Sequence, residues 1–363
     1  MSYSLIRERF SHMGAHSGYD LLCPALERIG VDARSVWLSD VLPIPFLDRF
    51  LKVVVKCVVK ASPFYGSSNL WTELNALRGQ WSSPGLTHIL YGENNLGLYS
   101  FEKIKRSEKL VVTVHQPFSW WEDQKINITQ KLKTTDALIV LSSSERDNFT
   151  ALLGDDRVHF VPHGVDTDFF SPPGVDEFEQ KQVAPMKRCL FVGQWLRDFD
   201  TLFGVIELVL KNDLDFVFDL VVPDISWRDP NAEVKLKQFE KFPQICRYQM
   251  ITDETLLGLY RNATLLILPL EESTANNAVL EAMSCGLPIV TNETTGIVDY
   301  TESSFANICP AKDAAAMVKA MQEISRNRNL QISMSNAARD VAVDKFAWRH
   351  IAVQIENIYR DLL

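Results

Sequence analysis

The chain has 363 residues, a length that predicts two domains of about 150–200 residues each. Its composition, with 46% hydrophobic and 23% charged residues, is typical of a globular protein that buries two full cores. The net charge of −9 argues against general nucleic-acid binding, which needs clustered Lys and Arg. Residues 1–172 carry 18 basic and 19 acidic side chains and the remainder 19 and 27, which indicates two units with different partners.

The six cysteines are scattered without a paired C-x-x-C spacing, which favours buried thiols in a reducing cytosol over a zinc site or disulfides. Residues 1–10 carry three charged side chains and no apolar run, so we expect no secretory signal. No stretch approaches the roughly 20 apolar residues of a membrane-spanning helix. We therefore expect a cytoplasmic protein.

Short apolar runs that alternate with helical stretches predict an α/β fold of parallel sheets flanked by helices. In the first half, residues 19–29 predict a helix that follows a first strand and a glycine-bearing loop. Four apolar runs then predict strands, at residues 86–91, 109–114, 137–141 and 158–162.

Residues 166–187, with three prolines and a Gln/Glu cluster, predict a linker. A second series of elements follows the linker and closes the chain. It comprises predicted strands at 189–192, 216–222, 265–268 and 288–290 and predicted helices at 311–326 and 330–345.

The segment 265–290 carries the strongest functional signal: a strand, a polar loop, a short helix, a glycine stop and a strand. Ser273, Thr274, Asn276 and Asn277 suit a helix N-terminus, where free backbone N–H groups and the helix dipole attract anions. Glu281 lies one to two turns into the same helix. By spacing alone, a well-capped βαβ crossover explains the segment equally well.

The run Glu281-Ala-Met-Ser-Cys-Gly-Leu-Pro288 resembles the signature of the retaining, nucleotide-diphosphosugar glycosyltransferases of the family-four group, also called glycosyl transferases group 1. The resemblance implies the GT-B fold, in which two Rossmann-like domains face each other across a cleft. Residues 1–165 plus 346–363 would form the acceptor-side domain, and residues 166–345 the nucleotide-sugar-binding domain. Glu281 would accept hydrogen bonds from the ribose hydroxyls.

Ser273 departs from the family pattern, which has a first Glu there that contacts the donor sugar. Either Glu272 substitutes through a one-residue loop shift, or the chain belongs to a subgroup with another donor. Thr274, Asn276 and Asn277 retain the capping chemistry, so backbone N–H contacts to the sugar or the phosphates are expected. The identity of the sugar stays open.

The run Phe191-Val-Gly-Gln-Trp-Leu-Arg197 is similar to the glycine-bearing turn, here at Gly193, where the family holds the diphosphate with an Arg and a Lys. Gln194 stands where the Arg is expected and Arg197 where the Lys is expected, so one cation replaces two. Arg197 would stabilise the leaving diphosphate. The alternative is a solvated Arg paired with Asp198 or Asp200.

Two further stretches are similar to the family in the expected order. Residues 161–166 resemble the crossover into the second domain, and residues 346–363 resemble the C-terminal helix that recrosses to the first.

In the first half, residues 12–19 stand where the family has a glycine-rich loop facing the donor phosphates and the acceptor. Gly14 and Gly18 would allow close backbone approach there, although an ordinary turn fits equally well. His115 follows a predicted strand at its carboxyl edge and resembles the family's His that contacts the donor sugar. A purely structural His is the alternative.

Residues 46–61 predict a basic amphipathic helix in which Arg49, Lys52, Lys56 and Lys60 share one stripe. Either the helix packs on the sheet with a solvated stripe, or it lies on an anionic membrane surface at the inner face of the membrane. The second alternative would favour a lipid-linked acceptor.

The resemblance implies a glycosyltransferase that moves a sugar, with retention, from a nucleotide-diphosphosugar to a hydroxyl of a small molecule, a glycan or a lipid-linked acceptor. We expect neither a metal nor a cofactor besides the co-substrate. The candidate catalytic residues are His115, Arg197 and Ser273. The candidate donor-binding residues are Gly14, Gly18, Gly193, Arg197, Thr274, Asn276, Asn277 and Glu281. A non-hydrolysing nucleotide-sugar epimerase and a non-catalytic sugar-nucleotide sensor or partner subunit are the alternatives.

Overall fold

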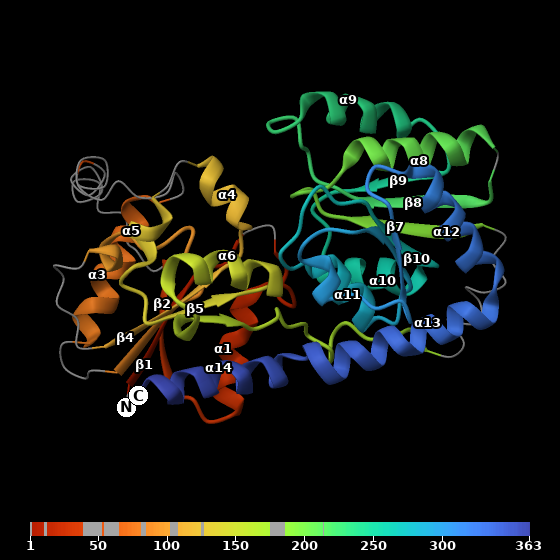
Figure 1. Cartoon of the computed structure of the whole chain (residues 1–363). Helices are drawn as coiled ribbons and strands as arrows, with labels where there is room; N and C mark the ends of the chain where they lie inside the picture. Colours follow the sequence, from red (N-terminus) through yellow and green to blue (C-terminus); the bar gives the residue numbers. More distant parts are fainter. Residues whose placement is uncertain are drawn as a thin grey trace. The chain divides into compact units, whose positions relative to one another are not determined.

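The computed structural model describes residues 2–10, 13–38, 53, 65–80, 85–101, 108–124, 127–174, 186–212 and 214–363 (Figure 1). The chain divides into two compact units. The first comprises Met1–Met13, Gly18–Gly164 and Trp348–Leu363, and the second comprises Gly14–Ser17 and Val165–Ala347. The predicted basic helix 46–61 lies outside the described residues, apart from Val53.

The first unit contains a parallel sheet of six strands in the order β2-β1-β3-β4-β5-β6. The strands are β1 (Ser2–Arg7), β2 (Ala33–Trp37), β3 (Gly85–Ile89), β4 (Lys109–Val114), β5 (Ala137–Val140) and β6 (Val158–Phe160). The four strands predicted in this half are confirmed. The strand order reverses at β1, which lies between β2 and β3 and marks a topological switch point.

Helices flank this sheet, and the helix predicted at 19–29 is confirmed, starting with one 3-10 turn at Tyr19–Leu21 and continuing as α1 (Leu22–Arg28). The other helices of the unit are α3 (Ser67–Gln80), α4 (Phe118–Asp123), α5 (Ile128–Leu132), α6 (Ser143–Leu153) and α14 (Trp348–Leu362).

Helix α14 is anchored to the sheet by a buried polar chain. The Tyr359 hydroxyl lies 2.5 Å from Nδ1 of His88, and Nε2 of His88 lies 2.8 Å from Oγ1 of Thr113. Burial, aided by His115, lowers the pKa of His88 to about 3. The ring is therefore neutral and can donate through one nitrogen and accept through the other.

The loop that follows β3 is held by Glu73 of α3, a fully buried carboxylate. It accepts the backbone N–H groups of Leu96, Gly97 and Leu98 and the hydroxyl of Tyr65. A glycine is needed at position 97, because a Cβ there would lie 2.1 Å from the Tyr65 ring.

Replacing Glu73 with Ala should lower the free energy of unfolding by about 3 kcal/mol or more, because buried N–H donors lose their acceptor. Urea denaturation followed by circular dichroism would measure the change. Glu122→Ala, on an exposed face of α4, is the matched control. Equal stability of the two variants would show that the three N–H groups find other acceptors.

The second unit contains another parallel six-stranded sheet, in the order β12-β11-β10-β7-β8-β9. The strands are β7 (Lys187–Val192), β8 (Phe216–Val221), β9 (Ile245–Tyr248), β10 (Leu265–Leu268), β11 (Ile289–Asn292) and β12 (Ala306–Cys309). This is the six-strand order of a dinucleotide-binding Rossmann sheet. The four strands predicted in this half are confirmed, whereas β9 and β12 were not predicted.

The helices of this unit lie on both faces of its sheet, with α8 and α9 above it and α10 and α11 below it in Figure 1. They are α8 (Phe199–Lys211), α9 (Pro230–Phe239), α10 (Asp253–Asn262), α11 (Asn277–Ser284), α12 (Ala314–Arg326) and α13 (Arg328–Val341). The predicted helix 311–326 begins later because the Asp313 carboxylate caps it by accepting the N–H of Ala316. The predicted helix 330–345 is wrong at its end, since α13 stops at Val341 and a π turn follows at Ala342–Phe346.

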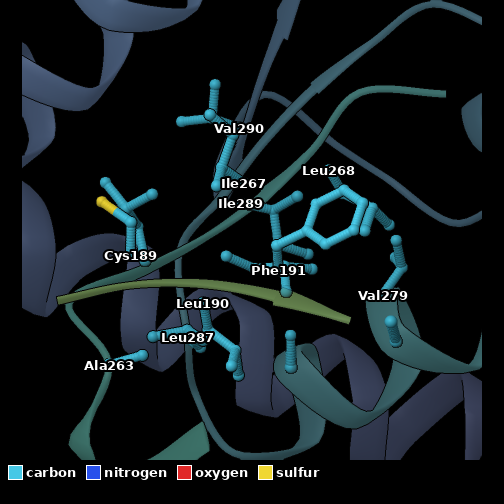
Figure 2. Packing of buried hydrophobic residues seen from close by; sticks show 14 of the residues in the cluster. Cys189, Leu190, Phe191, Ala263, Ile267, Leu268, Val279, Leu287, Ile289 and Val290 are labelled. Carbon is cyan, nitrogen blue, oxygen red and sulfur yellow. The ribbon is translucent and has the colours of Figure 1, made fainter. Parts of the chain in front are cut away.

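The core of the second unit forms where apolar residues of the central strands interdigitate with α11. Figure 2 shows Phe191 of β7 beside Leu268, Ile289 and Val279, and each of these side chains is fully buried. This packing supports the carboxyl ends of β7 and β10, where the candidate site lies.

Candidate active site

The site of the second unit lies at the switch point between the adjacent strands β7 and β10. The loops after these strands are joined by two backbone hydrogen bonds, from Asp198 N to Pro269 O and from Glu271 N to Leu196 O, both 3.0 Å. In open parallel sheets, ligands bind outside the carboxyl ends of the strands at such a point. The candidate residues Gly193, Arg197, Ser273 and Thr274 all lie on these two loops.

The N-terminus of α11 lies in the same region. Asn276 is its N-cap, and the side-chain Oδ1 accepts the N–H groups of Ala278 and Val279 at 3.1 and 3.4 Å. The predicted capping is thereby confirmed for Asn276, whereas the Ser273 hydroxyl makes no cap hydrogen bond. The same oxygen accepts a hydrogen bond of 3.3 Å from Nη2 of Arg197, so the guanidinium is directed to the positive end of this helix.

Arg197 is held by neutral oxygens, since its Nε donates to Val192 O at 3.0 Å and its Nη1 donates to Trp195 O at 2.9 Å. Among the residues that the structure describes, no carboxylate lies within ion-pair distance of it. The alternative of pairing with Asp198 is not observed, because that carboxylate caps α8. Burial lowers the pKa of Arg197 to about 10, so the side chain stays charged at neutral pH.

The turn that carries Arg197 requires Gly193. This residue has φ +97°, a conformation that L side chains rarely adopt, and a Cβ there would lie 2.8 Å from Nη2 of Arg197. The absence of a side chain lets the guanidinium pack directly against the backbone of the turn.

Glu281 lies on α11 and is only 4% exposed. Its Oε1 accepts the hydroxyl of Ser17 at 2.6 Å and its Oε2 accepts the hydroxyl of Tyr260 at 2.8 Å. Burial raises the pKa of Glu281 to about 7, against the opposing effect of these two hydrogen bonds. Each oxygen of the carboxylate thus accepts one hydroxyl hydrogen bond.

Ser273 and Thr274 are buried in the loop after β10. The Oγ of Ser273 has no hydrogen-bond partner among the described residues. Asn292 of β11 anchors the start of this loop, accepting Leu270 N at 2.7 Å and donating to Leu270 O at 2.9 Å. Gly296 lies directly against the loop, since a Cβ there would be 2.2 Å from Ser273 O.

The two glycines of the predicted glycine-rich loop fall in different units. Gly14 groups with the second unit, where a Cβ on it would meet the Asp253 carboxylate and where Ala15 N donates to Oδ2 of Asp253 at 2.5 Å. Gly18 groups with the first unit and has φ +96°.

His115 follows β4 in the first unit, at the carboxyl edge of the sheet. Its ring stacks on Tyr91 with centroids 4.3 Å apart, and its backbone N–H donates to Glu93 at 3.2 Å. Its Nδ1 lies 3.4 Å from Oε1 of the buried Glu93. The ring is thus supported by protein on more than one side.

Two residues of the site, Tyr260 and Arg228, were not singled out from the sequence. Tyr260 belongs to α10 and reaches Glu281 across 21 residues of sequence. Arg228 follows β8 and donates to Gln194 O at 2.8 Å. Both lie far along the chain from their partners, and neither carries a motif.

Comparison with known families gives two matches, one in each half of the chain. Residues 186–327 match the family described as Glycosyl transferases group 1, and residues 52–169 match Glycosyltransferase Family 4. Together the two matches include most of the second unit and much of the first.

Individual proteins agree with these families. The chain is 26% identical to an alpha-maltose-1-phosphate synthase of Mycolicibacterium smegmatis, over 76% of this chain and 75% of that protein. It is 25% identical to D-inositol 3-phosphate glycosyltransferase 1 of Catenulispora acidiphila, over 64% of this chain and 59% of that protein. Among solved structures, Anabaena HepE in complex with UDP-glucose is 13% identical with a TM-score of 0.73, over 100% of both chains.

The two Rossmann-like units, each with a switch-point edge, define a two-domain α/β protein of the GT-B fold. The chain belongs to the group 1 glycosyltransferases and is a glycosyltransferase enzyme. Within the described residues, no helix has the length and apolar character needed to cross a membrane.

Proposed function

We propose that this enzyme transfers a hexosyl group, with retention of anomeric configuration, from a nucleoside-diphosphate sugar to a hydroxyl of a small polar acceptor. The observation that carries this proposal is the buried Glu281 beside Arg197 and the N-terminus of α11, at the switch point of a Rossmann sheet. The UDP-glucose in the structure of Anabaena HepE supports a donor of this class. Two relatives named for maltose-1-phosphate and inositol 3-phosphate support a small phosphorylated acceptor.

Each candidate residue has a role in the proposed donor complex. Glu281 accepts the ribose hydroxyls in place of Ser17 and Tyr260, and Arg197 binds the diphosphate. Ser273 and Thr274 contact the sugar, and His115 keeps the role at the donor sugar that the family resemblance implies. The backbone around Gly14, Gly18 and Gly193, together with the helix terminus at Asn276 and Asn277, lines the remainder of the donor site.

The proposed reaction needs no covalent intermediate with the protein. The acceptor oxygen forms a bond to the anomeric carbon on the face from which the diphosphate departs, and the bond from that carbon to the phosphate oxygen breaks. The acceptor proton passes to the departing phosphate oxygen, which gives a nucleoside diphosphate and a glycoside of retained configuration. Arg197 and the α11 N-terminus stabilise the charge that develops on the diphosphate. These groups supply that stabilisation without a metal ion.

A panel of nucleotide-sugars differing in base and sugar would test the donor assignment. A donor at 100 times its Kd should add about 2.7 kcal/mol of stability, or roughly 5–10 °C in the melting temperature of a domain of this size. Incubation with phosphorylated sugars and polyols should then release nucleoside diphosphate and form a glycoside, with activity unchanged by EDTA. NMR of the product would report its anomeric configuration.

Specific outcomes separate this proposal from its alternatives. An inverted anomer would contradict retention, and loss of activity in EDTA would contradict metal independence. Interconversion of two nucleotide-sugars without an acceptor would indicate an epimerase. Binding without turnover, with every acceptor tried, would indicate a sensor.

A further inference from the structure

A second guanidinium approaches the turn after β7. Arg228 lies in the loop between β8 and α9, and its Nη1 donates to Gln194 O at 2.8 Å. The guanidinium carbon lies 4.5 Å from the centroid of the Trp195 ring, a cation–π contact. Arg228 and Arg197 line one cavity of about 90 Å³ together with Gln194.

Neither guanidinium is neutralised by an ion pair with a carboxylate in the described part of the chain. The hydrogen bonds of Arg197 go to two backbone carbonyls and an amide oxygen, and that of Arg228 goes to a carbonyl. After burial, the charge of Arg228 is among the influences that lower the pKa of Arg197. Two like charges that line one cavity repel each other, and a bound anion would relieve this repulsion.

Four carboxylates also line this cavity, and two of them are oriented to other partners. Asp198 and Asp229 are the N-caps of α8 and α9 and accept the N–H groups of Thr201 and Ala232, each at 2.9 Å. Burial raises the pKa of Glu271, and the charge of Arg228 opposes this rise. Asp200 lies in the first turn of α8, where the helix dipole offsets its charge. The two guanidinia therefore remain the groups in this cavity best able to bind an anion.

We propose that Arg228 is the second cation of the donor site and binds the diphosphate together with Arg197. This inference rests on the proposed function. The group 1 turn is expected to provide two cations, and here Gln194 occupies the place of one of them. Arg228 replaces that charge from a different loop, and the Gln194 carbonyl and the Trp195 ring hold its guanidinium at the turn. Its planar fork of N–H donors suits two phosphate oxygens at once.

The test compares Arg228→Gln with Arg228→Lys and with Arg326→Gln, which removes an exposed charge at the end of α12 in the same unit. Calorimetry would measure the Kd of UDP and of inorganic pyrophosphate, and ligand-observed NMR the Kd of uridine. Arg228→Gln should weaken both phosphorylated ligands about 10- to 100-fold and uridine less than about twofold. Arg228→Lys should recover part of the loss, and Arg326→Gln should bind all three as the wild type does.

Salt adds an independent measure, because a lost phosphate contact also reduces the dependence of binding on ionic strength. The Kd for UDP of Arg228→Gln should therefore change less between low and high salt than that of the wild type. A purely structural role of Arg228 in holding the turn would not produce this difference.

The outcomes separate the inference from the proposed function. UDP and pyrophosphate binding unchanged in Arg228→Gln would overturn the inference and leave the proposed function intact. An equal loss for UDP and uridine would also overturn it, by showing that Arg228 only holds the turn. A wild type that binds no nucleotide-sugar would overturn the proposed function. In that case, the pyrophosphate measurement alone decides whether Arg228 forms an anion site with Arg197.

Discussion

Glu281→Gln should make the second unit more stable at pH 8 while it weakens nucleotide binding. The pKa of Glu281 is raised to about 7 in the folded protein, above its ordinary value of about 4.3 in an unfolded chain. The folded state therefore binds more protons between these two values. Its stability falls as the pH rises through this window, by up to about 4 kcal/mol once the pH exceeds the folded pKa. A neutral amide escapes this penalty.

Hydrogen exchange of the core amides of β10 and β11 would measure the stability of this unit alone. At pH 8, Glu281→Gln should protect these amides more than the wild type does by about 3–4 kcal/mol, and the gain should fall to about 1 kcal/mol at pH 5. Glu323→Gln, on the exposed face of α12, should show no such gain. If the protection of Glu281→Gln relative to the wild type is lower at pH 8 than at pH 5, the pKa of Glu281 is not raised in the folded protein.

The same substitution stabilises the protein but should weaken its binding of the ligand. Two vicinal ribose hydroxyls donate to a carboxylate, whereas an amide offers one acceptor and one donor group. Binding of the wild type to UDP-glucose should weaken below pH 7, by at most about tenfold per pH unit, because protonated Glu281 loses an acceptor. Glu281→Gln should bind weakly at every pH, with no dependence in this range.

The fold could be predicted from the sequence where burial is complete. Strands such as β5 and β10 are buried at every residue and so appear as continuous apolar runs. The strands that were not predicted, β2, β9 and β12, lie at the edges of the two sheets. Their burial is only partial, so their residues mix polar and apolar types and produce no apolar run.

The candidate site could be predicted only where its residues follow one another in a motif. The spacing of Asn276 and Glu281 indicated a capped helix with a carboxylate on it, and the structure places both as expected. Arg228 and Gly296 act through the neighbours that strand order gives them, and no local pattern marks either residue. The sequence therefore predicted a single cation, Arg197, where the family has two. The structure brings a second cation, Arg228, to the same turn.

Gly296→Ala should disable the enzyme with little change in the chemistry of any side chain. The backbone of Gly296, with φ −90° and ψ −24°, suits alanine, so the obstacle is purely steric. The added Cβ would lie 2.2 Å from Ser273 O, 2.3 Å from Thr274 O and 2.7 Å from Thr274 Cα. These are backbone atoms, which no rotamer change can move aside, so the loop after β10 must shift.

A displacement of about 1 Å at a loop that positions the donor sugar should lower kcat/KM for sugar transfer about 100-fold. The overpacking should cost only about 1–3 kcal/mol of stability, so the protein should remain folded. Gly258→Ala in α10, where a Cβ meets nothing within 4 Å, is the matched control and should keep wild-type activity with slightly higher stability. Steady-state kinetics together with thermal denaturation of both variants would measure these effects. Wild-type kcat/KM in Gly296→Ala would mean that Ser273 and Thr274 do not contact the sugar, and the roles proposed for them would be wrong.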